Sequence, residues 1–130
     1  MDIKFTGVTT KNHQPRFGLM NGVQATAIRF ANYSSEKFIG LITSVDVTDS
    51  SKWVVGTATN LSVTSNTWYS LEIIFDNGTI TATTYNGSTE LGTVTSSYTN
   101  LSSTSNKLLL DPAYSNGANI NIKNIKVKSL

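Results

Sequence analysis

The sequence predicts an all-β fold, an antiparallel β-sandwich, and three observations support this prediction. Apolar residues alternate with polar ones in short runs, whereas the period of an amphipathic helix is nearly absent. Gly, Asn and Ser separate these runs at regular intervals, which is typical of sandwiches and barrels. Two Asn-Gly pairs, Asn77-Gly78 and Asn86-Gly87, stand between alternating runs, as tight hairpin turns require.

Ten segments have strand patterning. We expect strands over residues 2–6, 16–20, 25–31, 38–45, 52–56, 68–76, 79–85, 90–95, 107–111 and 119–128. The hairpin at Asn77-Gly78 is the clearest, because Asn-Gly supplies the positive φ angles of a type I′ turn. Alternation about that turn places Leu71 and Ile73 on an apolar face of the sheet, and Glu72 and Tyr85 on its polar face.

The length and composition favour one domain, residues 1–130, either alone or as one module of a longer chain. Cysteine is absent, which excludes disulfides and cysteine-based zinc sites. Charged residues make up only 14% of the chain, against about 25% in average soluble domains. Ser, Thr and Asn take their place, as is common in exported β-proteins. We therefore expect an extracellular, cell-surface or virion location.

Two classes of partner do not fit this composition. The net charge of +2 is too small, and its basic residues too scattered, for a nucleic-acid partner. No apolar run approaches the roughly 18 residues of a membrane span, so we expect no membrane insertion.

One stretch of sequence resembles a known superfamily. Residues 66–75 read Asn-Thr-Trp-Tyr-Ser-Leu-Glu-Ile-Ile-Phe, and residues 78–82 read Gly-Thr-Ile-Thr-Ala. This pattern resembles the concanavalin A-like lectin/glucanase superfamily, above all laminin-G-like jelly-roll domains, in which such a run enters a long strand before a tight turn. Residues 2–6, 16–19 and 119–128 are similar to the opening and closing strands of those domains. The resemblance implies a jelly-roll sandwich and a carbohydrate ligand.

We expect no enzymatic activity. The enzymes of this superfamily carry a Glu-x-Asp-x-x-Glu strand with both catalytic carboxylates, and the chain has no such segment, so the resemblance transfers no catalytic residue. Glycoside hydrolysis needs two carboxyl groups roughly 5 to 9 Å apart, and carboxylates are scarce here. The single histidine, His13, lies in a polar loop, and no nucleophile elbow accompanies any serine.

Candidate sugar-binding residues combine aromatic faces with polar groups, the general form of a ligand site. Alternation places Arg16 and Arg29 on a non-core surface. The full set of candidate ligand-binding residues is Arg16, Arg29, Tyr33, Trp53, Glu72 and Tyr85. The ordinary alternative is that Trp53, or more readily Trp68, closes one end of the sandwich, and that the arginines pair with Glu72 or Glu90.

Asp46 and Asp49 are the candidate metal ligands, and calcium is the candidate cofactor, because many jelly-roll lectins use it and it prefers six to eight oxygen ligands. Their spacing matches no EF-hand loop. A charged surface turn without metal is the favoured alternative.

These observations lead us to expect a non-catalytic carbohydrate-binding module of a surface adhesin, a secreted glycan-active protein, or a phage tail or receptor-binding protein. Its partner would be a poly- or oligosaccharide. The alternative is a structural or oligomerisation domain of a virion or cell-surface fibre, whose partners are further copies of the chain or modules of the parent protein. A truncated glycoside hydrolase is the third interpretation.

Overall fold

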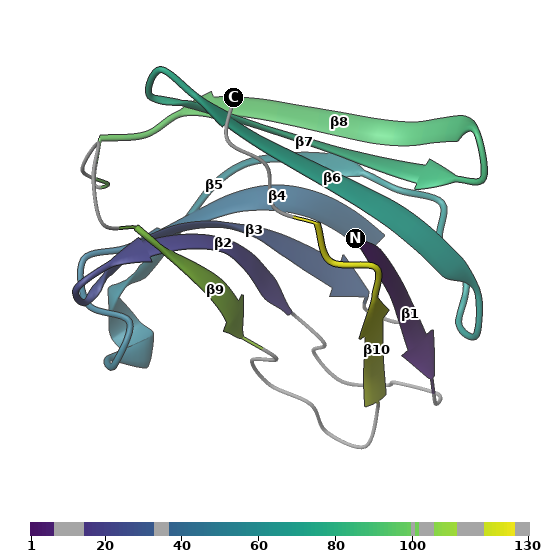
Figure 1. Ribbon diagram of the computed structural model, residues 1–130, viewed down its shortest axis with the longest axis horizontal. Helices are drawn as coiled ribbons and strands as arrows, with labels where there is room; N and C mark the ends of the chain where they lie inside the picture. Colours follow the sequence, from purple (N-terminus) through teal and green to yellow (C-terminus); the bar gives the residue numbers. More distant parts are fainter. Residues whose placement is uncertain (7–14, 33–36, 100, 102–105, 112–118, 127–130) are drawn as a thin grey trace.

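The fold is a sandwich of two antiparallel sheets, seen in a computed structural model that describes residues 1–6, 15–32, 37–99, 101, 106–111 and 119–126 (Figure 1). The prediction of an all-β sandwich is confirmed. Within the described residues the strands are β1 (Asp2–Thr6), β2 (Arg16–Asn21), β3 (Gln24–Asn32), β4 (Lys37–Ser44), β5 (Trp53–Asn60), β6 (Trp68–Asp76), β7 (Thr79–Asn86), β8 (Thr89–Ser97), β9 (Lys107–Asp111) and β10 (Asn119–Lys123).

The strands form two five-stranded sheets, which we call sheet A and sheet B. Sheet A has the order β10-β1-β6-β7-β8, and sheet B has the order β5-β4-β3-β2-β9. The expected three-stranded meander is β6-β7-β8. Asn77 and Gly78 form the first turn and both have positive φ angles, as a type I′ turn requires. The second turn differs from the prediction, because Asn86 still pairs with Thr89 and the turn residues are Gly87, which has a positive φ angle, and Ser88.

β1, β6 and β9 have the predicted bounds, and most other strands differ from the prediction by one or two residues at an end. β5 runs four residues past its predicted end at Gly56, to Asn60. The segment expected to start β5 at Lys52 is instead a single 3-10 turn, η1 (Ser50–Lys52), and β5 begins at Trp53. The last expected strand, residues 119–128, ends at Lys123, because Asn124 adopts a left-handed backbone with φ of 53°. Residues 127 and 128 lie outside the described residues.

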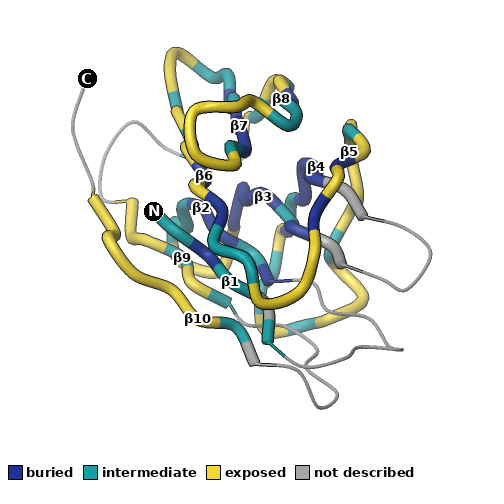
Figure 2. The backbone as a smooth tube through the Cα atoms, turned by 90° about the vertical axis from the view of Figure 1, so that its right-hand side faces the viewer, coloured by how far each residue is buried: buried dark blue, intermediate teal, exposed yellow. Residues whose placement is uncertain are grey.

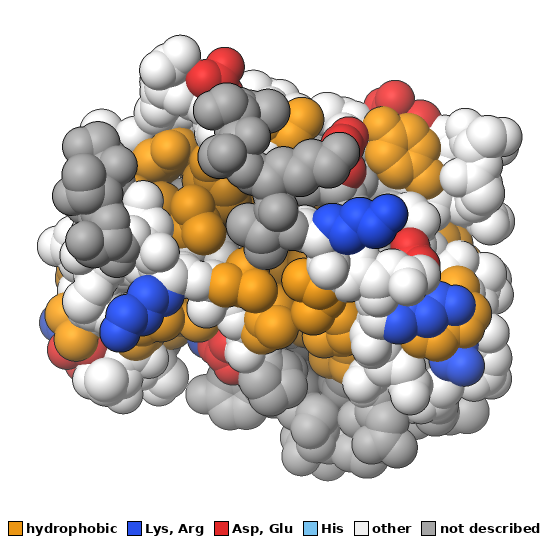
Figure 3. Space-filling model, in the orientation of Figure 1, with side chains coloured by type: hydrophobic (Ala, Val, Ile, Leu, Met, Phe, Trp, Pro, Cys, Tyr) orange, Lys and Arg blue, Asp and Glu red, His pale blue; other side chains and the backbone are white. Residues whose placement is uncertain are grey.

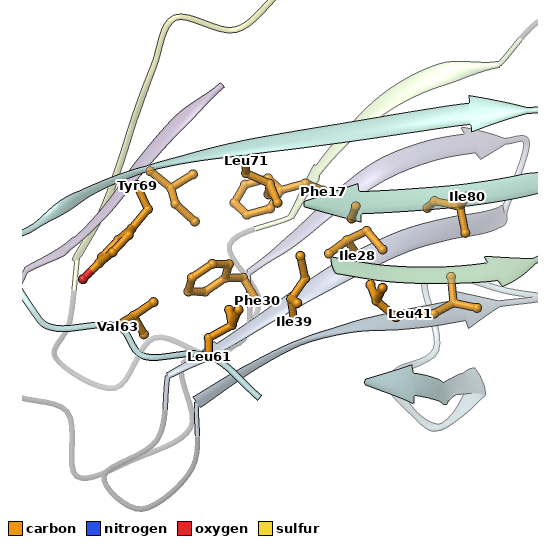
Figure 4. Close-up of a cluster of buried hydrophobic side chains, with 13 residues drawn as sticks. Phe17, Ile28, Phe30, Ile39, Leu41, Leu61, Val63, Tyr69, Leu71 and Ile80 are labelled. Atoms are coloured by element: carbon orange, nitrogen blue, oxygen red, sulfur yellow. The ribbon is translucent and has the colours of Figure 1, made fainter. Parts of the chain in front are cut away.

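The core consists of the apolar side chains that the two sheets turn toward each other (Figure 4). Figure 2 shows the buried stretches along β3, β4 and β7, in the middle of the sheets. Polar groups also enter this layer. Thr26 and Thr84 are fully buried, and the hydroxyl of buried Tyr69 accepts a hydrogen bond from the Thr64 amide at 2.8 Å. The largest fully buried side chains are Phe17, Phe30, Ile3, Ile28, Ile39, Leu71 and Ile80.

The sandwich is closed along one side and open along the other. At the closed side the Thr59 hydroxyl of β5 donates to the Thr93 carbonyl of β8 at 2.9 Å. Gly92 permits this approach, since a Cβ there would lie 2.9 Å from Leu61. At the open side the edge strands β9 and β10 keep Leu108, Leu110, Ile122 and other apolar side chains exposed. Figure 3 shows hydrophobic surface on this side.

Asp2 ties β10 to the rest of sheet A. Its carboxylate accepts hydrogen bonds from the Ser70 hydroxyl at 2.8 Å and from the Asn124 side-chain amide at 2.7 Å. These two bonds, the one from Asn124 first, hold the pKa of Asp2 below its ordinary value of 3.8. The ionised carboxylate is therefore favoured in the folded chain relative to the unfolded one.

We predict that Asp2 makes stability depend on pH in acid. Because its folded pKa is lowered, its contribution is present at neutral pH and is lost as the pH falls from about 4 through the folded pKa. The melting temperatures of the wild type and Asp2→Asn should be compared from about pH 6 to about pH 2.5. We expect the wild type to be more stable at the higher pH and the two to converge in acid. A constant difference would contradict this role.

We also predict that Gly18→Ala destabilises the fold. A Cβ on Gly18 would overlap the Thr26 carbonyl oxygen and lie 2.5 Å from the Ala27 Cα, and both are backbone atoms of the paired strand β3. Forcing extra atoms into a packed region costs about 1–3 kcal/mol. Equilibrium urea denaturation measures this loss. Gly56→Ala on edge strand β5, where the added atom meets only the side chain of Leu41, is the matched control and should cost less.

Candidate functional site

The candidate ligand-binding residues lie on two opposite faces of the sandwich. Arg16, Arg29 and Trp53 belong to sheet B, whereas Glu72 and Tyr85 belong to sheet A. In each sheet these residues have the opposite parity to the buried ones, so they point away from the core, as alternation predicts. Tyr33 lies outside the described residues. The structure therefore divides the set into two surfaces.

Sheet B is curved. The ribbons of β2, β3 and β4 bow toward sheet A at their middle (Figure 1), so the sheet is concave on the side away from the core, which we call the hollow face of sheet B. Small residues pair at its centre, with Gly18 of β2 directly opposite Ala27 of β3. The next strand contributes Ile42, which is opposite Ala27.

Arg16 is the polar residue around which this face is arranged. Strand register places it opposite Arg29 on β3 and opposite Asp111 on β9. Its guanidinium Nη1 donates to Asp111 Oδ2 at 2.9 Å, in an ion pair. Arg16 thus pairs with Asp111. The alternative drawn from the sequence, that it pairs with Glu72 or Glu90, was wrong for this arginine. Asp111 is the last residue of β9.

The same guanidinium stacks on Trp53, 4.2 Å from the centre of the indole ring. Trp53 begins β5, and β3 and β4 separate it from β2, so the contact requires the sheet to curve toward this face. Ala27 of β3 and Ile42 of β4 lie between the two strands, and both are buried although they face away from the core. We infer that the Arg16 and Trp53 side chains cover these two residues.

One hydrogen-bond donor of Arg16 is not used in the stack or in the ion pair. The Arg16 side chain is only 11% exposed, and its Nε is buried without a hydrogen-bond partner among the described residues. Arg16 therefore contacts both a carboxylate and an aromatic ring. Trp53 remains partly exposed, so its free surface can pack against an apolar ring face beside this ion pair.

The loop before Trp53 explains how the tryptophan reaches this position. Asp46 Oδ1 accepts from the amide and hydroxyl of Thr48, and Asp49 Oδ1 accepts in the same way from Ser51. Asp49 thereby caps η1, which leads directly into Trp53. The Val47 amide donates to the Val23 carbonyl at 2.7 Å and ties the loop to the β2–β3 turn.

These bonds give the two candidate metal ligands a structural role. The hydrogen bonds from Thr48 hold the pKa of Asp46 below its ordinary value. The part of the chain that the structure describes contains no group of three or more acidic or histidine side chains suited to a metal ion. The geometry of Asp46 and Asp49 is that of Asx turns, in which a carboxylate bonds the backbone two residues on.

The outer face of sheet A is rich in hydroxyl groups. Thr81 and Thr95 are joined at 3.1 Å and Thr83 and Thr93 at 2.8 Å, in a ladder across β7 and β8. Glu72 is exposed and lies opposite Thr83, and half-buried Tyr85 lies opposite Ser70.

Trp68 lies on this same outer face and does not close an end of the sandwich, so that interpretation was wrong. The Lys4 ammonium lies 4.8 Å from its ring centre, and the Lys123 ammonium lies 4.2 Å from it. The signal was present in the sequence, because Trp68 has the parity of Ser70 and Glu72, which alternation already places outside. The stack joins β10, β1 and β6 through cation–π contacts.

We predict that calcium leaves the protein unchanged, because Asp46 and Asp49 act as turn caps. The melting temperature should be the same in calcium and in chelator. Asp46→Asn and Asp49→Asn should keep it, since an amide oxygen accepts the same bonds, whereas Asp49→Ala should cost about 0.5–1 kcal/mol. A calcium-dependent rise in melting temperature that Asp46→Asn removes would instead establish a metal site.

Comparison with known proteins adds no identification. No helix among the described residues has the length and apolar character to cross a bilayer. No protein-family model matches the chain, and neither a curated protein nor a solved structure gives a significant match.

Proposed function

We propose that the chain is a non-catalytic carbohydrate-binding module of the concanavalin A-like, jelly-roll type, and that a glycan binds on the hollow outer face of sheet B. The observation that carries this proposal is the Arg16 guanidinium, stacked at 4.2 Å on Trp53 and paired at 2.9 Å with Asp111. Sugars are recognised by this combination, since their C–H faces pack on aromatic rings and their hydroxyls bond to charged planar groups.

The shape of this face supports a shallow, extended ligand. The small residues Gly18 and Ala27 lie at the centre of this face. Arg29, on β3, lies between the strands that carry Arg16 and Trp53. A linear saccharide laid across the strands would contact several of these side chains in turn. Shallow sites of this kind bind weakly one at a time, on the order of 10 µM to 1 mM, and gain strength by repetition.

The placement of the carboxylates favours a binding role over a hydrolytic one. Glycoside hydrolysis needs two carboxyl groups roughly 5 to 9 Å apart. Glu72 lies on the outer face of sheet A, whereas Asp111 lies on the opposite outer face. Asp111 is engaged in the ion pair with Arg16. A truncated glycosidase therefore remains the weakest of the three interpretations.

The setting in which such a module works follows from its surface. A threonine-rich outer face with few charges, and a chain without cysteine, fit a location outside the cell or on a virion. We propose a poly- or oligosaccharide as the partner, within an adhesin, a secreted glycan-active protein, or a phage tail or receptor-binding protein. The structural or fibre domain remains the second candidate, favoured by the apolar side chains exposed at the open side of the sandwich.

The test is titration calorimetry against a panel of neutral and acidic polysaccharides, with two tryptophan variants. We expect Trp53→Ala to weaken binding at least tenfold, because it removes the stacking surface, and each factor of ten corresponds to about 1.4 kcal/mol. Trp68→Ala is the matched control, since it removes the same side chain from the opposite face and should keep the affinity.

Circular dichroism separates a binding effect from a folding effect. Trp53→Tyr keeps an aromatic ring beside Arg16 and should retain both the fold and part of the affinity. Absence of binding to every polysaccharide, or equal losses for Trp53→Ala and Trp68→Ala, would overturn the proposed site.

A further inference from the structure

Strand β9 is the outermost strand of sheet B, beside the open side of the sandwich. It pairs with β2 on one side, and among the described residues no strand pairs with it on the other. An edge strand presents a row of backbone amides and carbonyls that are able to pair with a further strand. Proteins commonly protect such an edge with charges, bulges or proline within the strand. The three central residues of β9 are all leucine, so its middle has no such protection.

The leucines of β9 are exposed on the side where the core should cover them. Leu108 and Leu110 lie opposite Leu19 and Phe17, so they face the interior layer. They are nevertheless 46% and 40% exposed, whereas Phe17 is 1% exposed. The inner face of sheet B therefore extends beyond the core, and at its last strand, β9, Leu108 and Leu110 stay largely exposed.

The side chains of β9 match those of a second, antiparallel β9 in charge and in apolar character. It runs Lys107-Leu108-Leu109-Leu110-Asp111, with opposite charges at its two ends. If a second β9 pairs antiparallel about Leu109, Lys107 lies opposite the partner subunit's Asp111, and Leu108 lies opposite the partner subunit's Leu110. Both cross-strand pairs are favourable, and the arrangement closes by a two-fold axis.

The other three edge strands lack this property. β5 contains no charged residue, β8 contains only Glu90 and β10 contains only Lys123. Antiparallel self-pairing of these strands therefore brings no opposite charges together. Among the described edges, the charge pattern singles out β9 as the one suited to a second copy.

We propose that the chain forms a two-fold homodimer through antiparallel pairing of β9 with the β9 of a second copy. The two copies of sheet B then form one continuous ten-stranded sheet, with the order β5-β4-β3-β2-β9 running out from the axis on each side. Leu108 and Leu110 are covered by their counterparts. The Asp111 carboxylate lies between Arg16 of its own chain and the partner subunit's Lys107, which a carboxylate with several acceptor sites can accommodate.

The dimer goes beyond the proposed glycan binding and does not depend on it. It places the hollow faces of both copies on the same side of one sheet, because pairing within a sheet preserves which face points outward. The interface rests mainly on a five-residue strand, so we expect a weak dimer with a dissociation constant on the order of 10–100 µM.

Sedimentation velocity over a concentration series, without any glycan, tests the dimer. The wild type should shift from monomer to dimer with rising concentration. Leu110→Lys places a charge on the inner side of β9 and should weaken association at least tenfold. Val54→Lys is the matched control, because Val54 is 64% exposed on β5, the other edge of the same sheet, and it should leave association unchanged.

A charge reversal keeps the test independent of the leucines. Lys107→Glu sets like charges opposite each other in both cross-strand pairs and should weaken the dimer on the order of tenfold, with a smaller effect at high salt. Lys126→Glu, an exposed lysine after β10 with the same change of charge, should have no effect. A wild type that stays monomeric up to about 1 mM, or a dimer unaffected by both β9 variants, would overturn the proposal.

Discussion

The packing of the two apolar sheet faces against each other is the interaction on which the rest of the structure depends. Phe17, Phe30 and Ile28 of sheet B meet Leu71 and Ile80 of sheet A in one layer, and the strand period of two then sends every alternate residue outward. The surface chemistry is thus set by the core. The two sheets are joined at the edge where β5 meets β8. At the opposite edge, where β9 and β10 lie, the apolar layer between the sheets is open.

The strands and the faces of individual residues could be predicted from the sequence, whereas their arrangement across the molecule could not. Alternation and the Asn-Gly pairs are local, so they identified β6-β7-β8 and placed Arg16 and Glu72 outside. The neighbours of a strand depend on contacts between distant segments. Arg16 meets Asp111, 95 residues away, only because β9 adds to the edge of β2. The same long-range order separates Glu72 from Arg16 by the full thickness of the sandwich.

The hollow face shows how backbone requirements and surface chemistry depend on each other. Gly18 is needed because β2 lies very close to Ala27 of β3 at this point. Because neither residue has a large side chain, a long side chain can extend across the outer face above them. Arg16 uses that room to reach Trp53 across two intervening strands. A guanidinium held by an aromatic ring on one side and a carboxylate on the other has little rotational freedom left to lose when a ligand arrives.

The pairing of β1 with β10 has a mechanical consequence. Asp2 lies opposite Lys123, so the start of β1 and the end of β10 meet at one corner of sheet A. Tension applied there through the flanking chain would load the hydrogen bonds of this pair one after another, as in a zipper, and not all at once in shear. β10 is an edge strand, so it would peel away at low force while the other nine described strands stayed folded. A module tethered at both ends would therefore yield first by extending its last strand, and would act as a soft extensible link between stiffer neighbours.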